Sequence, residues 1–169
     1  MGINALTKPV QLEDGMTLDG FCSGAATVDN WLASRARAAK ARGSAVVYVS
    51  HRAGADASAE PPAGFYTLSS ASITRSGVTG GWLKRNAPDQ IPVILLGMLG
   101  VDGRHQGSGL GKMLLHDASA RSLAVADSIG AKALVVDPLD DEAAAFYSRY
   151  GFKLVPGLRR MYVPLRMPR

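Results

Sequence analysis

The chain has 169 residues, of which 47% are hydrophobic, and it carries a net charge of +5 with an isoelectric point of about 9.6. No apolar run approaches the roughly 20 residues that cross a bilayer, and the N-terminal segment lacks the apolar core of a signal peptide. The single cysteine, Cys22, excludes an internal disulfide. We therefore expect one soluble, cytoplasmic domain covering residues 1–169, with no membrane partner.

Two segments carry basic residues without any carboxylate. The first covers residues 31–42, and the second runs from residue 143 to the C-terminus. Such a distribution suggests a polyanionic partner, either a nucleic acid or a phosphorylated cofactor. Solvated helix and tail charge would give the same pattern, so charge alone leaves both interpretations open.

In the first half of the chain the sequence predicts one helix and two strands. Thr27 is a suitable N-cap for a helix over 28–41. β-branched and aromatic residues predict strands over 45–50 and 65–70. The polar stretch 76–91 is rich in Gly, Pro and Asn, which predicts a long connection on the substrate side of the fold.

The second half predicts a strand, a long helix, a second strand, a second helix and two closing strands. The expected bounds are 92–101, then a glycine-rich turn and a helix to about 129, then 133–136, 140–150, 152–155 and 161–165. The apolar stripe expected to face the core along the long helix consists of Leu110, Leu114, Ala118, Val125 and Ile129. Together these elements predict a mixed α/β fold in a single domain.

The glycine-rich turn follows a buried-looking strand and opens a helix, a placement in which backbone N–H groups bind phosphate. A Walker A loop is excluded because Gln106 stands where its first glycine should be and Met113 replaces the Ser or Thr. A dinucleotide fingerprint is disfavoured because Leu114 occupies its small-residue position. What remains is Gln-x-x-Gly-x-Gly, read from Gln106 to Gly111.

This pattern resembles motif A of the GNAT acetyltransferases. The resemblance implies that the amides of the turn bind the pyrophosphate of acetyl-CoA and that the strand before it binds the pantetheine arm. The implied cofactor-binding residues are Leu99, Gly100, Val101, Gln106, Gly107, Ser108, Gly109, Leu110, Gly111 and Lys112. It also implies the GNAT fold, a mixed central sheet with splayed strands flanked by helices.

A second segment, Ala144 to Phe152, is similar to the Ala-x-x-Phe-Tyr-x-x-x-Gly-Phe signature on the last helix of that family. The resemblance implies that Tyr147 is the catalytic acid, which protonates the departing thiolate of coenzyme A. Tyr150, three residues further on, is expected to be a packing residue.

Three further phrases resemble the toxin subfamily that acetylates the α-amine of aminoacyl-tRNA and stops translation. They are Phe21-Cys22-Ser23-Gly24, Gly64-Phe65-Tyr66-Thr67-Leu68 and Ile91-Pro92-Val93-Ile94-Leu95-Leu96-Gly97-Met98-Leu99. Such toxins are usually homodimers that a ribbon-helix-helix antitoxin neutralises. The chain departs from the subfamily pattern at Met98 (usually Arg), Gly100 (usually Ala) and Asp137-Pro138 (often His-Ala).

The chemistry of amines gives separate support for an α-amine acceptor. A lysine amine, with a pKa of about 10.4, needs a strong base before it can attack a thioester, whereas an α-amine at about 7.7–8.0 is appreciably neutral at pH 7. The basic side chains predicted to contact the tRNA are Arg35, Arg37, Lys40, Lys84, Arg85, Arg159 and Arg160.

Two other functions remain open from the sequence: acetylation of a small-molecule amine or a protein N-terminus, and a non-catalytic module that binds tRNA or a partner. Cys22 is expected to be a small buried residue and not a nucleophile, because no base lies nearby in the sequence. The three histidines, His51, His105 and His116, are unclustered, so no metal site is predicted.

Overall fold

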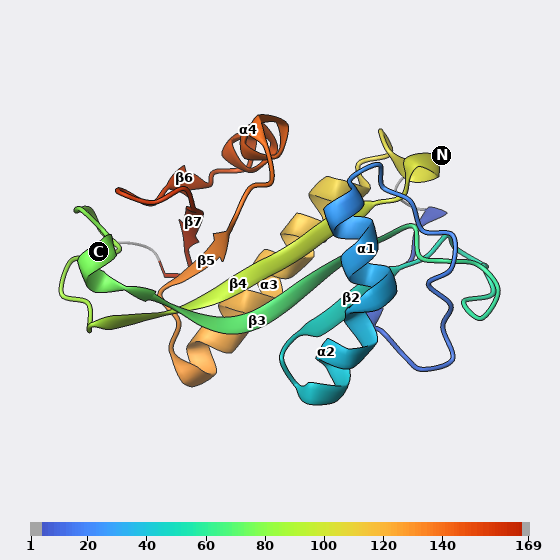
Figure 1. Ribbon diagram of the computed structural model, residues 1–169, viewed down its shortest axis with the longest axis horizontal. Coiled ribbons are helices and arrows are strands. Elements are labelled where there is room, and N and C mark those ends of the chain that lie inside the picture. Colours follow the sequence, from blue (N-terminus) through green and yellow to red (C-terminus); the bar gives the residue numbers. More distant parts are fainter. Residues whose placement is uncertain (1–4, 167–169) are drawn as a thin grey trace. The chain divides into compact units, whose positions relative to one another are not determined.

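The computed structural model describes residues 5–166 and shows a mixed α/β fold. In chain order the elements are β1 (Val10–Gln11), α1 (Ala26–Ser34), α2 (Ala36–Arg42), β2 (Val46–Ser50), β3 (Gly64–Thr74), the 3-10 helix η2 (Arg75–Gly77), β4 (Gln90–Val101), the 3-10 helix η3 (Gly103–His105), α3 (Leu110–Ile129), β5 (Ala133–Val136), α4 (Asp141–Arg149), β6 (Lys153–Leu154) and β7 (Met161–Pro164) (Figure 1). The strands form a sheet in the order β1-β2-β3-β4-β5-β7-β6. Strand β4 pairs with β5 in parallel, whereas the β1–β2, β2–β3, β5–β7 and β6–β7 ladders are antiparallel, which confirms the predicted mixed sheet.

The described residues group into two compact units. The first contains the chain up to Ser69 together with Met98–Ala118, and the second contains Ser70–Gly97 together with the chain from Ser119. Strands β3 and β4 and helix α3 each contribute residues to both units. The expectation of a single domain over residues 1–169 therefore stays a prediction. Within the described residues, no helix combines the length and apolar character needed to cross a membrane.

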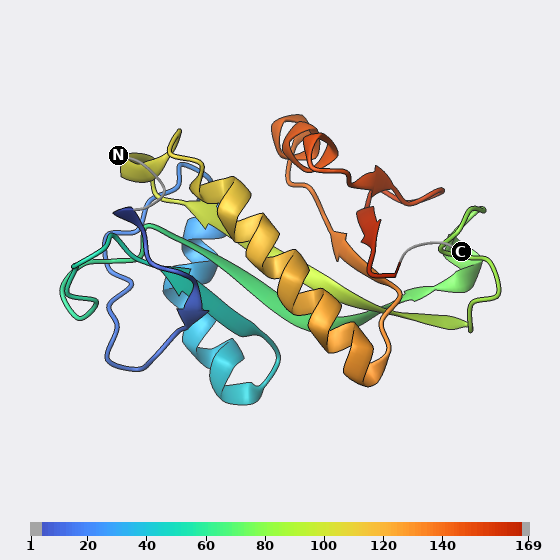
Figure 2. The ribbon, with the colours of Figure 1, turned by 180° about the vertical axis from the view of Figure 1, so that it is seen from behind.

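In the first unit, helices lie on both faces of the strands β2 and β3. Helices α1 and α2 pack on one face (Figure 1), and the beginning of α3 packs on the other, seen in front in Figure 2. Successive residues of β3 point to opposite faces: Phe65 belongs to the core under α1, whereas the Tyr66 hydroxyl bonds the Asp117 carboxylate of α3. The fully or nearly fully buried members of this core are Leu12, Val28, Leu32, Ala36, Val47, Val49 and Phe65.

The second unit has its own core, which includes the segment between β3 and β4. Val78 and Leu83 of this segment are fully buried, so the predicted long polar connection is anchored by apolar side chains. The Lys132 amine donates hydrogen bonds to the carbonyls of Leu83 (3.1 Å) and Arg85 (3.0 Å) and lies 4.8 Å from the centre of the Trp82 ring. The other buried members of this core are Ile73, Ile91, Val93, Ala133, Val135, Val155 and Tyr162.

The helix predicted over 28–41 is in fact two helices. Helix α1 begins at Ala26, and its N-cap position is Ala25, so Thr27 is not the cap. The Asp29 carboxylate, in the first turn of α1, holds the segment before the helix by accepting the Ser23 N–H at 2.9 Å. Regular helical backbone ends at Arg35, whose φ of −121° separates α1 from α2. Strand β1 was not predicted, because two exposed residues carry no periodic pattern.

The predicted apolar stripe of α3 is correct in its first half only. Leu110, Leu114 and Ala118 are buried, but Val125 and Ile129 are 42% and 72% exposed. The buried stripe instead continues at i+4 spacing through Ser122 and Ala126, both fully buried. The small side chains at those positions contributed too little hydrophobicity for the sequence pattern to identify the face.

Gly100 of β4 lies where a side chain would collide with α1. A Cβ atom placed there would lie 2.7 Å from Val28 Cγ1 and 3.1 Å from Phe65 Cε1. This close approach explains the glycine at this position, because α1 fills the space that a side chain would need.

We expect Gly100→Ala to lower the free energy of unfolding by about 1–3 kcal/mol, measured by urea denaturation, because overpacking forces α1 away from the sheet. The same change made in a Val28→Ala background should cost clearly less, because the colliding methyl group is gone. Gly15→Ala is the control, since a Cβ at Gly15 meets nothing within 4 Å. An equal cost of Gly100→Ala in both backgrounds would contradict the steric explanation.

Candidate functional site

Strand β4 continues beyond its ladder with β5. The ladder joins Val93–Leu96 to Ala133–Val136, and β5 ends there, whereas β4 extends to Val101. Along this extension the N–H of Met98 donates to Thr67 Oγ1 at 3.0 Å, on the side of β3. Because consecutive residues of a strand direct their backbone groups to opposite edges, the N–H groups of Leu99 and Val101 face the other edge.

The structure separates the three candidate residues of this strand. Leu99 and Val101 offer outward N–H groups that can bind an extended ligand arm along the edge. Gly100 differs from them, because its N–H faces β3 and its Cα packs closely against the core under α1. Its role is therefore close packing. The neighbouring Asp102 N–H, which donates to the Ala63 carbonyl at 2.8 Å, confirms the alternation.

The turn after β4 has the geometry of an anion site. Gly107 and Gly109 adopt φ values of 79° and 85°, which non-glycine residues rarely adopt. The turn leads into helix α3, whose first turn contains Lys112 and no acidic residue, so the positive end of the helix dipole is left for a ligand. A cavity of about 100 Å³ adjoins the turn, lined by Leu6, Arg104, His105, Gln106, Gly107 and Ser108.

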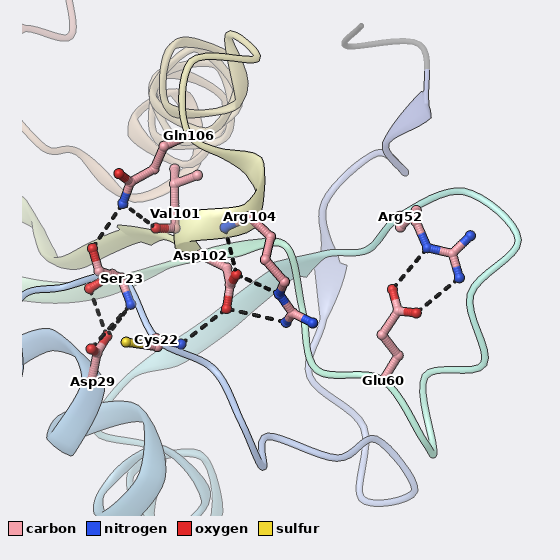
Figure 3. A network of polar contacts seen from close by, with 9 residues as sticks. All are labelled: Cys22, Ser23, Asp29, Arg52, Glu60, Val101, Asp102, Arg104 and Gln106. Carbon is pink, nitrogen blue, oxygen red and sulfur yellow. Dashed lines mark hydrogen bonds and ion pairs between the residues drawn. The ribbon is translucent and has the colours of Figure 1, made fainter. Parts of the chain in front are cut away.

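Gln106 uses its side chain to hold the turn in place. Its amide nitrogen donates to the carbonyls of Ser23 (2.8 Å) and Val101 (3.0 Å), as Figure 3 shows. A side-chain amide has two N–H donors, and both are used here. Only its backbone N–H is therefore left to bind a phosphate, which refines the sequence expectation for this residue.

Cys22 is exposed, so the expectation of a small buried residue was wrong. The reason is that the structure uses the backbone of Cys22 and leaves its thiol at the surface. Its N–H donates to Asp102 Oδ2 at 3.0 Å, and its carbonyl accepts the Gly103 N–H at 2.8 Å. These contacts could not be predicted from the sequence, because they join positions about 80 residues apart along the chain.

Tyr147 lies in the second unit, on helix α4. The helix is capped by Asp140, whose carboxylate accepts the Ala143 N–H at 2.7 Å. The Tyr147 ring is 7% exposed and lies 5.3 Å from Phe146 and 5.5 Å from Phe152, centroid to centroid. Burial raises the pKa of Tyr147 to about 12. Its phenol therefore stays protonated well above neutral pH.

The seven basic candidates divide into those with internal contacts and those without. The Arg37 guanidinium donates to the Met16 carbonyl, and the Lys40 amine donates to the Leu12 carbonyl at 2.5 Å. Arg160 forms a two-point contact with Asp137, at 2.7 and 3.3 Å. Lys84 is half-buried. Among the described residues, no hydrogen bond or ion pair involves the exposed side chains of Arg35, Arg85 and Arg159, so these three are available to a polyanion.

The ion pair between Arg160 and Asp137 also explains one departure from the toxin pattern. Asp137 follows β5 directly, and Arg160 precedes β7, the antiparallel partner of β5. The carboxylate thus joins the two strand ends. Residues 5–166 contain no group of three or more His, Cys, Asp or Glu side chains arranged to hold a metal ion.

The sequence was compared with protein families and with known proteins. Residues 70–154 match the family model described as the acetyltransferase (GNAT) domain. The tRNA-acetylating toxin of Mycobacterium tuberculosis is 38% identical over 154 residues, which cover 91% of this chain and 89% of that protein. Both similarities, to the family model and to the toxin, concern an acetyltransferase. The chain belongs to the GNAT acetyltransferase family.

Solved structures share the fold. AtaT in complex with acetyl-methionyl-tRNAfMet superposes with a TM-score of 0.83 at 23% identity, over 94% of each chain. AtaTR bound with acetyl-CoA gives a TM-score of 0.81 at 22% identity, over 96% of this chain and 95% of that one. This similarity confirms the GNAT fold predicted from the sequence.

The left-handed backbone of the turn leads to a test. We expect Gly109→Ala to lower the free energy of unfolding by about 1 kcal/mol, because an L side chain is strained at positive φ. It should also weaken coenzyme A binding, measured by calorimetry, because relief of the strain rotates the neighbouring N–H groups.

Gly103→Ala is the matched control within the same turn. Gly103 does not adopt a positive φ, and its Cβ would meet the Cys22 carbonyl at an ordinary 3.6 Å. We expect this variant to stay within about 0.5 kcal/mol of the parent. Equal effects of the two substitutions would show that the turn does not depend on left-handed backbone.

Proposed function

We propose that the protein transfers an acetyl group from acetyl-CoA to the α-amine of aminoacyl-tRNA and acts as a toxin that blocks translation. The observation that carries this proposal is the 38% identity with a tRNA-acetylating toxin over nearly the full length of both chains. The chain contains both features on which acetyl transfer would depend, the turn from Gln106 to Gly111 and Tyr147. We also propose that residues 1–169 form a single acetyltransferase domain.

The donor site would lie at the end of β4 and the turn after it. The N–H groups of the turn, with the N-terminus of α3, would bind the pyrophosphate of acetyl-CoA. The outward N–H groups of Leu99 and Val101 would bind the pantetheine arm and the thioester carbonyl. The left-handed glycine backbone, the adjoining cavity and Lys112 in the first turn of α3 fit a phosphorylated ligand of this kind.

The chemistry needs one acid and a neutral amine. The α-amine nitrogen attacks the thioester carbonyl carbon, so a C–N bond forms and the carbonyl oxygen gains negative charge, which the strand N–H groups stabilise. The C–S bond then breaks, and the departing thiolate takes the proton of the Tyr147 phenol. The amine loses a proton to solvent, and solvent returns one to Tyr147, which balances the reaction.

The acceptor would bind through exposed cations. Arg35, Arg85 and Arg159 are the best placed of the predicted contacts because no described group engages their side chains. A homodimer, a ribbon-helix-helix antitoxin and a cytoplasmic location are parts of the same proposal, since translation is the target. Acetylation of a small amine or a protein N-terminus, and a non-catalytic binding role, are the alternatives that the following experiment separates.

Labelled acetyl-CoA is supplied to the purified protein with a pool of aminoacyl-tRNA. We expect label on the aminoacyl group and a loss of about 10²–10⁴ in rate for Tyr147→Phe, because the phenol proton is removed. Tyr150→Phe is the matched control: Tyr150 is half-buried three residues away on the same segment and packs on the same Phe146 ring. It should keep nearly the parental rate.

Label on a small amine and none on tRNA would show that the acceptor is a small amine and not aminoacyl-tRNA. An absence of label on any amine would favour the non-catalytic role. Equal rates for the parent and Tyr147→Phe, with transfer to tRNA intact, would remove only the role of Tyr147.

The pH dependence of transfer gives a second test. Between about pH 6 and 9 the rate should rise until the α-amine is neutral, near or below its usual pKa of about 7.7–8.0, and then stay level. It should not fall at the upper end, because Tyr147, with a pKa of about 12, remains protonated there. A rate still rising steeply at the upper end would indicate a lysine acceptor.

A further inference from the structure

Asp102 is a buried carboxylate at the junction of β4 and the coenzyme turn. The residue is 2% exposed. Its carboxylate accepts the Cys22 N–H at 3.0 Å, the Arg104 N–H at 3.0 Å and the Arg104 Nε–H at 2.8 Å, with the Nη2 of Arg104 at 3.3 Å (Figure 3). A buried charge is costly unless donors surround it. The donors here come from two distant parts of the chain.

The carboxylate is held in its ionised form. Burial by itself would raise the pKa of Asp102, but the hydrogen bonds from the Arg104 side chain and the Arg104 and Cys22 N–H groups outweigh it and lower the pKa. The stabilisation that depends on this charge is therefore complete above the usual carboxyl pKa of about 3.9 and is lost only as the pH falls further. Asp102 is a fixed negative charge at every pH at which translation operates.

The segment Cys22–Ser23, here called the brace, is tied to the turn and to α1. On the turn side, Cys22 accepts the Gly103 N–H at 2.8 Å, and Ser23 accepts the Gln106 amide at 2.8 Å. On the helix side, the N–H and the hydroxyl of Ser23 donate to the Asp29 carboxylate at 2.9 and 2.6 Å. Figure 3 shows the contacts of Ser23 with Gln106 and Asp29. Asp102 supplies the only carboxylate among the contacts between the brace and the turn in the described residues.

We propose that Asp102 is a positioning residue for acetyl-CoA, which sets the direction in which the turn leaves β4. Asp102 stands between the outward N–H groups of Leu99 and Val101 and the turn glycines Gly107 and Gly109. Its bonds to the brace and to Arg104 fix the angle between these two sets of donors. The inference rests on the donor site proposed above.

A direct contact between Asp102 and the coenzyme is excluded on two grounds. A carboxylate repels a pyrophosphate, and its two oxygens already accept four donors from Cys22 and Arg104. Its influence on the coenzyme can therefore only be exerted through the backbone that it holds.

The sign of one substitution separates positioning from simple electrostatics. Asp102→Asn removes a negative charge close to the phosphate site, which by charge alone should tighten binding of coenzyme A. The asparagine, however, turns an N–H₂ group toward the donors of Arg104 or Cys22, and the mismatch should release the turn. We expect the Kd of coenzyme A, measured by calorimetry, to rise about tenfold.

In the transfer assay, the KM for acetyl-CoA should rise by a similar factor in Asp102→Asn, while the rate at saturating acetyl-CoA falls much less. A merely structural role would lower the melting temperature and leave both KM and Kd unchanged.

Glu60→Gln is the matched control. It removes the same charge with the same change of atoms, and Glu60 pairs with Arg52 at 2.9 Å and not with the brace. Because Glu60 also lowers the positive potential around Arg104 and His105, this variant should bind coenzyme A as tightly as the parent or slightly more tightly.

If Asp102→Asn fails to fold, the Kd of coenzyme A is measured for Asp29→Asn instead. This variant loosens the brace from its α1 end, away from the coenzyme, and should raise the Kd about threefold. An unchanged or lowered Kd in the folded variants would overturn the positioning role. Failure of the parent protein to bind coenzyme A would instead overturn the proposed donor site, so the two failures are distinguishable.

Discussion

The structure depends on one constraint of backbone chemistry: polar groups of a strand need partners wherever the neighbouring strand ends. Strand β4 reaches this point after Leu96, where its ladder with β5 stops. From there to Val101 one edge of the strand carries N–H groups that an extended ligand can satisfy. The glycine turn and the N-terminus of helix α3 follow at once and offer further N–H donors beyond the end of the strand. A coenzyme A molecule has an amide-bearing arm and a pyrophosphate in that order.

The turn and Tyr147 were identified from the sequence because they lie in short segments that resemble GNAT motifs, and their roles stay predictions. The contacts that hold the turn in place were not predicted. The brace depends on hydrogen bonds between residues about 80 positions apart, which involve backbone atoms and leave no periodic trace. The break at Arg35 and the exposure of Val125 were missed for a related reason, because tertiary packing decides them.

Counting charges along the sequence did not reveal which basic side chains form contacts within the protein. Three of these side chains donate hydrogen bonds to backbone carbonyls: Arg37, Lys40 and Lys132. The Arg160 guanidinium donates to the Asp137 carboxylate. These side chains fasten segments that lack regular structure, such as the stretch before α1 and the one before β4. Some of the basic residues that raise the isoelectric point therefore serve to stabilise the fold. The exposed basic side chains without such contacts, Arg35, Arg85 and Arg159, describe a surface for a polyanion better than the total charge does.

The contact between Gly100 and Val28 has a consequence for the evolution of this family. The two positions share one small volume, so a methyl group gained on the strand must be offset by one lost on the helix. Alanine at position 100 could therefore be reached from this sequence most easily after Val28 is replaced by a smaller residue. Because of this steric contact, two positions far apart in the chain are expected to change together. The contact also restricts the order in which the two substitutions can occur.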